Sequence, residues 1–158
     1  MKSDTKNIKS LGSGKTTYAT TPSKTILETF KNQHRGIYLV PFAMERDEFT
    51  SLCPKTGQPD QARMEFIYVP NEKMVESKSL KLYYFSFRNT GEFHEDVTNR
   101  IAKDLYEVLS PKYLRVYADF APRGGIAIRP IVEMWGLKTS IPEASQIEKL
   151  VNTWDIKK

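Results

Sequence analysis

The chain has 158 residues, 39% of them hydrophobic, which is the size of one domain and enough to build a single core. Lys and Arg outnumber Asp and Glu by 24 to 19, so the surface favours anionic partners, although a net charge of +5 also serves solubility alone. No apolar run could span a bilayer and no secretory signal opens the chain, so we expect a cytoplasmic protein without a membrane partner. One cysteine and two histidines exclude an internal disulfide and argue against a metal site.

Residues 1–23 are rich in Ser, Thr, Lys and Gly and carry few large apolar side chains, which predicts a flexible N-terminal arm. Within this arm, the string G-S-G-K-T at Gly12–Thr16 is similar to a phosphate-binding P-loop. That motif needs a second Gly five residues before Gly14, where Lys9 stands, and a strand ahead of it. We therefore do not interpret this string as a nucleotide site.

Two strands joined by an irregular loop are predicted after a short helix whose apolar face carries Ile26, Leu27 and Phe30. The run Gly36–Phe42 predicts the first strand, in which Pro41 indicates a sheet edge or a strand end. The run Arg63–Val69 is rich in aromatic and branched residues and predicts the second. The connection between them, C-P-K-T-G-Q-P-D, has two prolines and a glycine, which fix a compact loop of the kind that carries function.

Two amphipathic helices are predicted next. Ser77 is a good N-cap for the first helix, whose apolar face repeats at helical spacing through Leu80, Tyr83, Tyr84 and Phe87. The second helix has acidic residues at its N-terminal end, where the helix dipole favours them, and Pro111 follows its C-terminal end. Its apolar face comprises Val97, Ile101, Leu105, Val108 and Leu109.

A second pair of strands completes the domain. Tyr113–Phe120 alternates in polarity, P-R-G-G at Pro122–Gly125 predicts a turn, and Ile126–Trp135 predicts the last strand. The order strand, strand, helix, helix, strand, strand within residues 24–142 predicts an α+β domain, with an antiparallel sheet and both helices on one face. Residues 143–158 form an amphipathic segment that could cover this domain's own core or dock on a neighbouring subunit, through Ile147, Leu150, Val151 and Trp154.

The single cysteine is the first candidate for chemistry, although a lone cysteine is more often a buried hydrophobe than a nucleophile. Cys53 lies in the Pro-bounded loop instead of an apolar strand, and Asp60 follows across a turn that can bring the two together. A nucleophile beside an acid is therefore conceivable.

Other candidate side chains gather at the starts of the two helices. Glu76, His94 and Glu95 lie there, and simple capping or dipole interactions also explain all three. Lys78 and Lys81 are three residues apart on one helix face, which suits either solvent or a bound phosphate. Spacing alone does not decide between these alternatives.

Three strings of the sequence carry a more specific signal: Phe49–Asp60 (F-T-S-L-C-P-K-T-G-Q-P-D), Glu76–Tyr83 (E-S-K-S-L-K-L-Y) and Phe85–Asp96 (F-S-F-R-N-T-G-E-F-H-E-D). Together with P-R-G-G they resemble the NADPH-dependent 7-cyano-7-deazaguanine reductases, the nitrile reductases of queuosine biosynthesis, over roughly Gly36–Ile131. The chain length resembles the branch of that family built from one module instead of two. The resemblance implies a tunnelling fold, in which a ring-forming homo-oligomer closes a barrel from several sheets and places active sites at subunit interfaces.

The resemblance also implies a reaction. Cys53 attacks the nitrile carbon of the deazaguanine base as a thiolate, and Asp60 supplies a proton to the nitrogen, which gives a covalent thioimide. Two NADPH co-substrates provide the hydrides that complete the reduction to the primary amine. His94 is expected beside the reacting group.

Binding residues follow from the same resemblance. The carboxylates of Glu95 and Glu76 are expected to accept hydrogen bonds from the base, and the remaining substrate contacts are Val75, Ser77 and His94. The phosphates of NADPH are assigned to Lys78, Ser79, Lys81 and Arg123. No G-x-G-x-x-G motif occurs, so we expect neither a Rossmann site nor a metal.

Two other functions fit parts of the sequence. A zinc-dependent enzyme of the same fold, related to the GTP cyclohydrolases, would need ligands that the chain lacks. A basic RNA-binding module would stack bases on Tyr68, Tyr83, Tyr84 and Tyr117. Core packing explains the spacing of these tyrosines more simply, so we expect no direct nucleic-acid partner.

Overall fold

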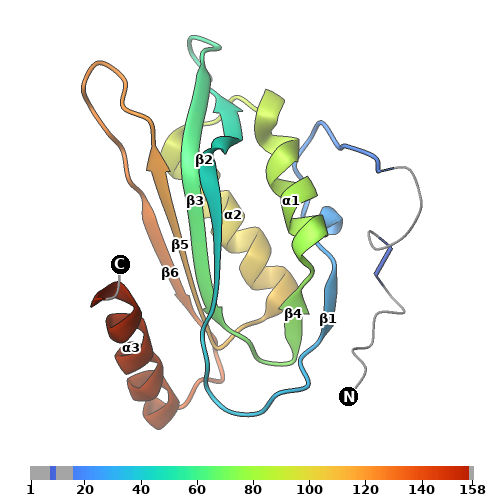
Figure 1. Cartoon of the computed structure of the whole chain (residues 1–158), viewed down its shortest axis with the longest axis vertical. Helices are drawn as coiled ribbons and strands as arrows, with labels where there is room; N and C mark the ends of the chain where they lie inside the picture. Colours follow the sequence, from blue (N-terminus) through green and yellow to red (C-terminus); the bar gives the residue numbers. More distant parts are fainter. Residues whose placement is uncertain (1–7, 10–15, 157–158) are drawn as a thin grey trace.

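The structure, a computed structural model, describes residues 8–9 and 16–156. Apart from Thr16, the P-loop-like string therefore lies outside the described residues. The described part of the N-terminal arm lies alongside the domain (Figure 1). Ile8 is buried, the ring of Tyr18 lies 4.6 Å from that of Phe85, and Arg100 donates a hydrogen bond to the carbonyl of Pro22.

The main sheet has four antiparallel strands, in the spatial order β2-β3-β5-β6, which confirms the predicted α+β class (Figure 1). Their bounds are β2 (Val40–Leu52), β3 (Pro59–Val69), β5 (Tyr113–Phe120) and β6 (Ile131–Trp135). Pro41 lies in the edge strand β2, where a residue without an N–H is tolerated. A second, two-stranded sheet pairs β1 (Thr29–Lys31) with β4 (Lys73–Val75).

Three sequence predictions differ from the observed elements. The helix predicted around Ile26 is only a short 3-10 turn, η1 (Lys24–Ile26), because Phe30 is drawn into β1 by pairing with β4. The last predicted strand is shorter and begins at Ile131, because Pro130 before it has no N–H to donate. The first strand continues to Leu52 through an irregular register, which carries β2 up to the loop that contains Cys53.

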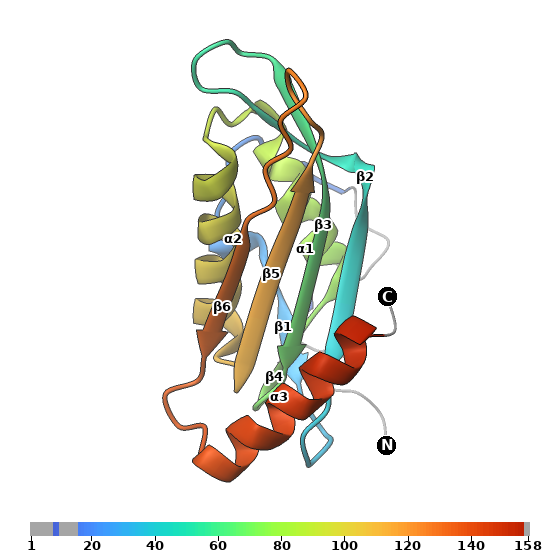
Figure 2. The same ribbon diagram turned by 90° about the vertical axis from the view of Figure 1, so that its left-hand side faces the viewer.

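Helices α1 (Ser77–Phe85) and α2 (His94–Leu109), with the 3-10 turn η2 (Ser86–Asn89) between them, cover one face of the sheet (Figure 2). Their predicted apolar faces are buried in the main core, which confirms the helical spacing. The burial of each large apolar side chain contributes about 1.5–3 kcal/mol. The largest fully buried side chains of this core include Tyr68, Tyr83, Phe49, Phe66 and Phe87.

The opposite face of the sheet is covered over its lower part by α3 (Ile141–Ile156) (Figure 2). Ile147 and Val151 of α3 pack against Ile67, Val69 and Tyr113, so the amphipathic segment covers this chain's own sheet. Arg115 adds a two-pronged ion pair with Asp155, at 2.5 and 2.8 Å. None of the described helices is long and apolar enough to cross a membrane.

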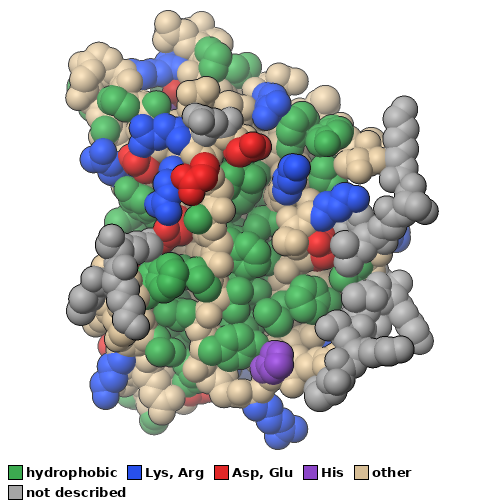
Figure 3. All heavy atoms as spheres, viewed as in Figure 1, with side chains coloured by type: hydrophobic (Ala, Val, Ile, Leu, Met, Phe, Trp, Pro, Cys, Tyr) green, Lys and Arg blue, Asp and Glu red, His purple; other side chains and the backbone are tan. Residues whose placement is uncertain are grey.

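The upper part of that face is charged. Asp119 pairs with Arg46 at 2.5 Å and with Arg129 at 2.7 Å. Figure 3 shows charged side chains of both signs gathered at the upper end of the molecule. The two faces of the sheet therefore differ, since one is a continuous apolar core and the other is apolar only beneath α3.

Candidate active site

The loop between β2 and β3 holds Cys53 in a tight turn at one end of the sheet (Figure 1). The amide of Cys53 donates to the carbonyl of Gln58, and the amide of Gly57 donates back to the carbonyl of Cys53, both at 2.9 Å. Gly57 has a φ of 68°, a left-handed conformation that a side chain would disfavour. The turn leaves Cys53 partly exposed and free of any disulfide.

This turn activates the cysteine. A hydrogen bond from the Thr56 side chain, then the backbone N–H groups of Thr56 and Lys55, lower the pKa of Cys53 to about 7. The positive charge of Arg123 acts in the same direction. An ordinary thiol has a pKa near ~8.5, so the loop makes about half of Cys53 a thiolate at neutral pH. Thr56 was not assigned a role from the sequence, although a hydroxyl three residues after a cysteine in a turn is a usable signal.

Replacement of Thr56 by Val is expected to raise the pKa of Cys53, because the side-chain donor that contributes most is lost while the volume is kept. The reactive thiolate would then form only at higher pH. The midpoint of iodoacetamide alkylation against pH measures this directly and should lie near 7 in the unmodified protein. Thr50→Val, a change three residues before Cys53, is the control and should leave the midpoint in place. An unchanged midpoint in Thr56→Val contradicts the assigned role.

Asp60 lies beside this loop as a buried carboxylate in contact with two side chains, those of His94 and Arg123. Its Oδ1 atom is 2.9 Å from Nε2 of His94 and 2.7 Å from Nη2 of Arg123. Only 4% of Asp60 is exposed, and a buried carboxylate of this kind needs such partners. Asp60 and His94 were both predicted as catalytic, and the structure brings their side chains into contact.

Arg123 was predicted to bind the phosphates of NADPH, but in this chain it reinforces the cysteine loop. The same Nη2 atom donates to the carbonyls of Gln58 and Pro59, at 3.0 Å each, besides contacting Asp60. All of these contacts use one nitrogen, and a third of the side chain is exposed. Part of the Arg123 side chain is therefore open to solvent next to the loop that holds Cys53.

The orientation of His94 is fixed by packing. Its ring stacks on Phe120 with centroids 3.9 Å apart and an interplanar angle of 8°. His94 opens α2, and its Nδ1 atom is buried and makes no hydrogen bond with the described residues. Glu95 follows it as an exposed side chain in the first turn of α2, where the positive end of the helix dipole favours a carboxylate. Glu95 is thus placed next to the Asp60–His94 pair.

The remaining predicted site residues form a second cluster around the start of α1. The N-cap of α1 is Glu76 and not Ser77 as predicted, because its two oxygens accept from two amides, those of Lys78 at 2.8 Å and Ser79 at 2.7 Å. The Ser79 hydroxyl is buried, donating to the Glu76 carbonyl at 2.8 Å and accepting from the Glu28 amide at 2.9 Å. The amide of Val75 donates to the hydroxyl of Tyr68 at 3.3 Å.

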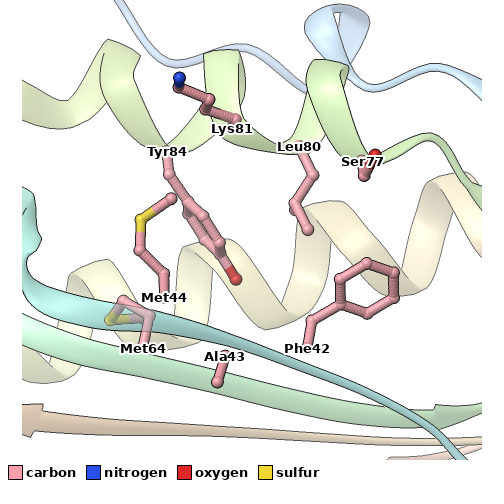
Figure 4. A pocket seen from close by; sticks show the side chains of 8 residues that line it. All are labelled: Phe42, Ala43, Met44, Met64, Ser77, Leu80, Lys81 and Tyr84. Carbon is pink, nitrogen blue, oxygen red and sulfur yellow. The ribbon is translucent and has the colours of Figure 1, made fainter.

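Ser77 and Lys81 line a small cavity between α1 and the edge strand β2 (Figure 4). Its volume is about 120 Å³, and its walls are mostly apolar. The hydroxyl of Tyr84 is buried there and makes no hydrogen bond with the described residues. The other lining residues are Phe42, Ala43, Met44, Met64 and Leu80.

The two clusters lie far apart within one chain. Val75 contacts Tyr68 near the end of β3, whereas Asp60 lies near the start of that strand, eight residues before Tyr68, which corresponds to about 26 Å along a strand. The chain therefore brings Cys53, Asp60, His94 and Arg123 together but leaves Glu76 and the α1 lysines at a separate place (Figure 1).

The geometry gives little support to the two alternative functions, a zinc-dependent enzyme and an RNA-binding module. Within the described part of the chain, no three His, Cys, Asp or Glu side chains are grouped so that they could hold a metal ion. Three of the four tyrosines considered for base stacking, Tyr68, Tyr83 and Tyr84, are at most 3% exposed and serve the core.

Comparison with known proteins places the chain in a family. The family model described as QueF-like protein matches residues 59–138. The NADPH-dependent 7-cyano-7-deazaguanine reductase of Neisseria meningitidis (strain MC58) is 56% identical over 124 residues, which are 78% of each chain. The chain belongs to the QueF-like family. The resemblance inferred from the three sequence strings is thereby confirmed.

Further relatives of this QueF-like chain agree. The NADPH-dependent 7-cyano-7-deazaguanine reductase of Bacillus cytotoxicus is 55% identical over 128 residues, covering 80% of this chain and 76% of its relative. Among solved structures, the apo form of the archaeosine synthase QueF-Like is similar, with a TM-score of 0.55. The match covers 70% of this chain and all of that one, and at 15% identity it supports the fold alone.

Proposed function

We propose that this protein reduces the nitrile of 7-cyano-7-deazaguanine to the primary amine with NADPH, as a step of queuosine biosynthesis in the cytoplasm. The observation that carries the proposal is a cysteine with a pKa lowered to about 7, in a loop that lies beside the Asp60–His94 pair. The names of the Neisseria and Bacillus relatives, NADPH-dependent 7-cyano-7-deazaguanine reductases, supply the substrate and the reductant.

The chain's own residues account for the first step. The Cys53 thiolate attacks the nitrile carbon, one carbon–nitrogen π bond opens, and the nitrogen takes a proton from Asp60 to give a thioimide. Asp60 takes up the thiol proton first and then passes it to the nitrile nitrogen, so the step ends with the sulfur bonded to the thioimide carbon and Asp60 as a carboxylate. His94 and Arg123 hold the Asp60 carboxylate in place throughout. The covalent bond keeps the carbon–nitrogen double bond fixed for reduction.

NADPH supplies the two hydrides of the overall reduction. Lys78 and Lys81 are the residues that we propose for its phosphates, because they lie on consecutive turns of α1, and Lys81 is exposed beside the cavity in Figure 4. The outward part of Arg123 is proposed as a third contact, which would bring the cofactor to Cys53. The hydroxyl of Ser79 already hydrogen-bonds to Glu76 and Glu28 of the same chain. Ser79 is therefore proposed as a cofactor contact only through its backbone.

We further propose that the active site is completed between subunits of a ring with the tunnelling fold. The sheet ends in two edge strands, β2 and β6, whose pairing between copies would continue it into a barrel. Glu76, Val75 and Ser77 of one subunit would then complete the base pocket beside Cys53 and Glu95 of the next. This arrangement accounts for the separation of the two clusters within one chain.

The proposed function is tested by incubation of the purified protein with 7-cyano-7-deazaguanine in the absence of NADPH, followed by measurement of intact mass. We expect an increase equal to the mass of the whole base, because attack on a nitrile expels no leaving group. Cys53→Ala should show no increase, and NADPH added to the wild-type adduct should release the amine. If the wild-type mass is unchanged and no NADPH is consumed, the proposal is wrong.

For the base pocket, Glu95→Gln is expected to weaken substrate binding by about tenfold to a hundredfold, because a charge-assisted hydrogen bond to the base becomes a neutral one. Binding of NADPH should change little. Asp96→Asn, which removes a neighbouring charge from the same helix turn, is a matched control. Titration calorimetry with each ligand separates the two effects, and an equal loss for substrate and NADPH contradicts the role of Glu95.

A further inference from the structure

Ser51 is a buried polar side chain that the proposed mechanism does not use. Side chains alternate along a strand, so Phe49 and Ser51 near the end of β2 face the same side, toward the helices. Phe49 is packed in the main core, and Ser51 follows it as a fully buried residue at 0% exposure. The Ser51 hydroxyl makes no hydrogen bond with any described residue. Buried hydroxyls nearly always have a partner, so this one requires an explanation.

The register of the sheet places Ser51 directly opposite the catalytic carboxylate. Ser51 pairs with Asp60 across β2 and β3, and directly opposed residues share a face with Cβ atoms about 4.5–5.5 Å apart. Rotation about one side-chain bond moves the serine oxygen among three staggered positions. The Ser51 hydroxyl is therefore within reach of the Asp60 carboxylate.

Asp60 itself has one oxygen engaged. His94 from α2 and Arg123 from the turn after β5 both contact Oδ1. These two side chains are the ion-pair partners of Asp60 among the described residues, and Cys53 lies in the adjacent loop. The buried Ser51 hydroxyl is a further candidate hydrogen-bond donor, which would reach Asp60 from the adjacent strand β2.

The neighbouring residue provides a comparison within the same strand. Thr50 also has a buried hydroxyl oxygen without a hydrogen bond, but it is opposite Gln61 and faces the other side of the sheet. Of these two neighbours, Ser51 is the one that combines an unused donor with a position on the face of Asp60, directly opposite its carboxylate.

We propose that Ser51 is a positioning residue for Asp60, whose hydroxyl donates a hydrogen bond to the second carboxylate oxygen during thioimide formation. This inference rests on the proposed function. The hydroxyl keeps its proton, and no covalent bond to Ser51 forms or breaks. Its effect is to stabilise the carboxylate that remains when Asp60 has given its proton to the nitrile nitrogen, while His94 and Arg123 hold the other oxygen.

The test compares Ser51→Ala, Ser51→Thr and the control Thr50→Val, using the rate of adduct formation with 7-cyano-7-deazaguanine without NADPH, measured by intact mass over a range of pH. We expect Ser51→Ala to slow adduct formation by about 10- to 100-fold, the size expected for a hydrogen bond to a charged group. The acidic limb of its pH profile should move to higher pH, because a carboxylate without this donor is protonated more readily. Ser51→Thr, which keeps the hydroxyl, should recover most of the rate.

Thermal unfolding of each variant separates positioning from folding. An unshifted pH profile in Ser51→Ala, or a similar loss of rate in Thr50→Val, overturns the inference. So does a loss of rate in Ser51→Ala that only follows a loss of folded protein, or a failure of Ser51→Thr to recover the rate while it remains folded. If the wild-type protein forms no adduct, the proposed function itself fails, and that outcome is distinct from an active wild type with an equally active Ser51→Ala.

Discussion

Replacement of Asp60 by Asn is expected to slow thioimide formation by about 10²- to 10⁴-fold, the usual contribution of a positioned acid–base group. Asn keeps the shape and a hydrogen-bonding oxygen, but it cannot carry the thiol proton to the nitrile nitrogen. The thiolate itself should survive, because loss of a neighbouring negative charge does not disfavour it and the donors from Thr56 remain. Alkylation by iodoacetamide should therefore stay fast while adduct formation becomes slow.

Asp119→Asn is the matched control for this change. Asp119 is also an aspartate that pairs with two cationic side chains, Arg46 and Arg129, but it lies on the other face of the sheet. Its replacement should alter thermal stability to some degree and leave the rate of adduct formation near that of the wild type. If the two variants lose activity equally, or if Asp60→Asn loses alkylation together with adduct formation, Asp60 acts through structure and not through proton transfer.

The fold was predictable where local pattern and tertiary packing agree. In α2 the apolar spacing from Val97 to Leu109, the acidic first turn and Pro111 all indicate the same helix, and the structure has it from His94 to Leu109. The small β1–β4 sheet was missed because its strands are three residues long and form only when segments distant in sequence meet. Strands this short show no alternating pattern of polar and apolar residues from which they could be predicted.

The site shows the same division. The string around Cys53 carried its own signal, and the turn chemistry that activates the thiol is local to that string. Arg123 is 63 residues from Asp60, and their contact depends on the register between β3 and β5, in which Ala62 pairs with Phe120. A sequence predicts the P-R-G-G turn but not what the turn faces. The sequence therefore predicted only a phosphate contact for the Arg123 guanidinium, whereas in the structure this group also hydrogen-bonds to the loop that holds Cys53.

The mechanism and the assembly are linked through this geometry. Activation of Cys53 needs only the loop and Arg123, so a single subunit could form the thiolate. Recognition of the base is proposed to need Glu76, which lies at the far end of β3 from Asp60. If the proposed oligomer is dissociated, thiolate formation and substrate binding should therefore respond differently, with alkylation retained and adduct formation lost.

Mixed oligomers of Cys53→Ala and Glu76→Gln are expected to regain activity that neither variant has alone. Each proposed site takes Cys53 from one subunit and Glu76 from its neighbour, so in a random equal mixture half the positions supply the cysteine and half the glutamate. About one quarter of the sites are then intact, and activity should approach about one quarter of the wild-type value. Gln keeps an acceptor oxygen for the N-cap of α1, which limits the damage to folding.

Co-expression of the two variants with different tags, followed by two-step purification, isolates the mixed oligomers for turnover assays with NADPH and 7-cyano-7-deazaguanine. The control pairs Cys53→Ala with Asp60→Asn. Both of these residues lie in the same loop cluster and come from the same subunit, so no intact site can form in any mixture. Recovery in the first mixture and not in the second supports a site shared between neighbours. No recovery in either, from oligomers shown to contain both chains, means that Glu76 serves only as the cap of α1 or acts within its own subunit.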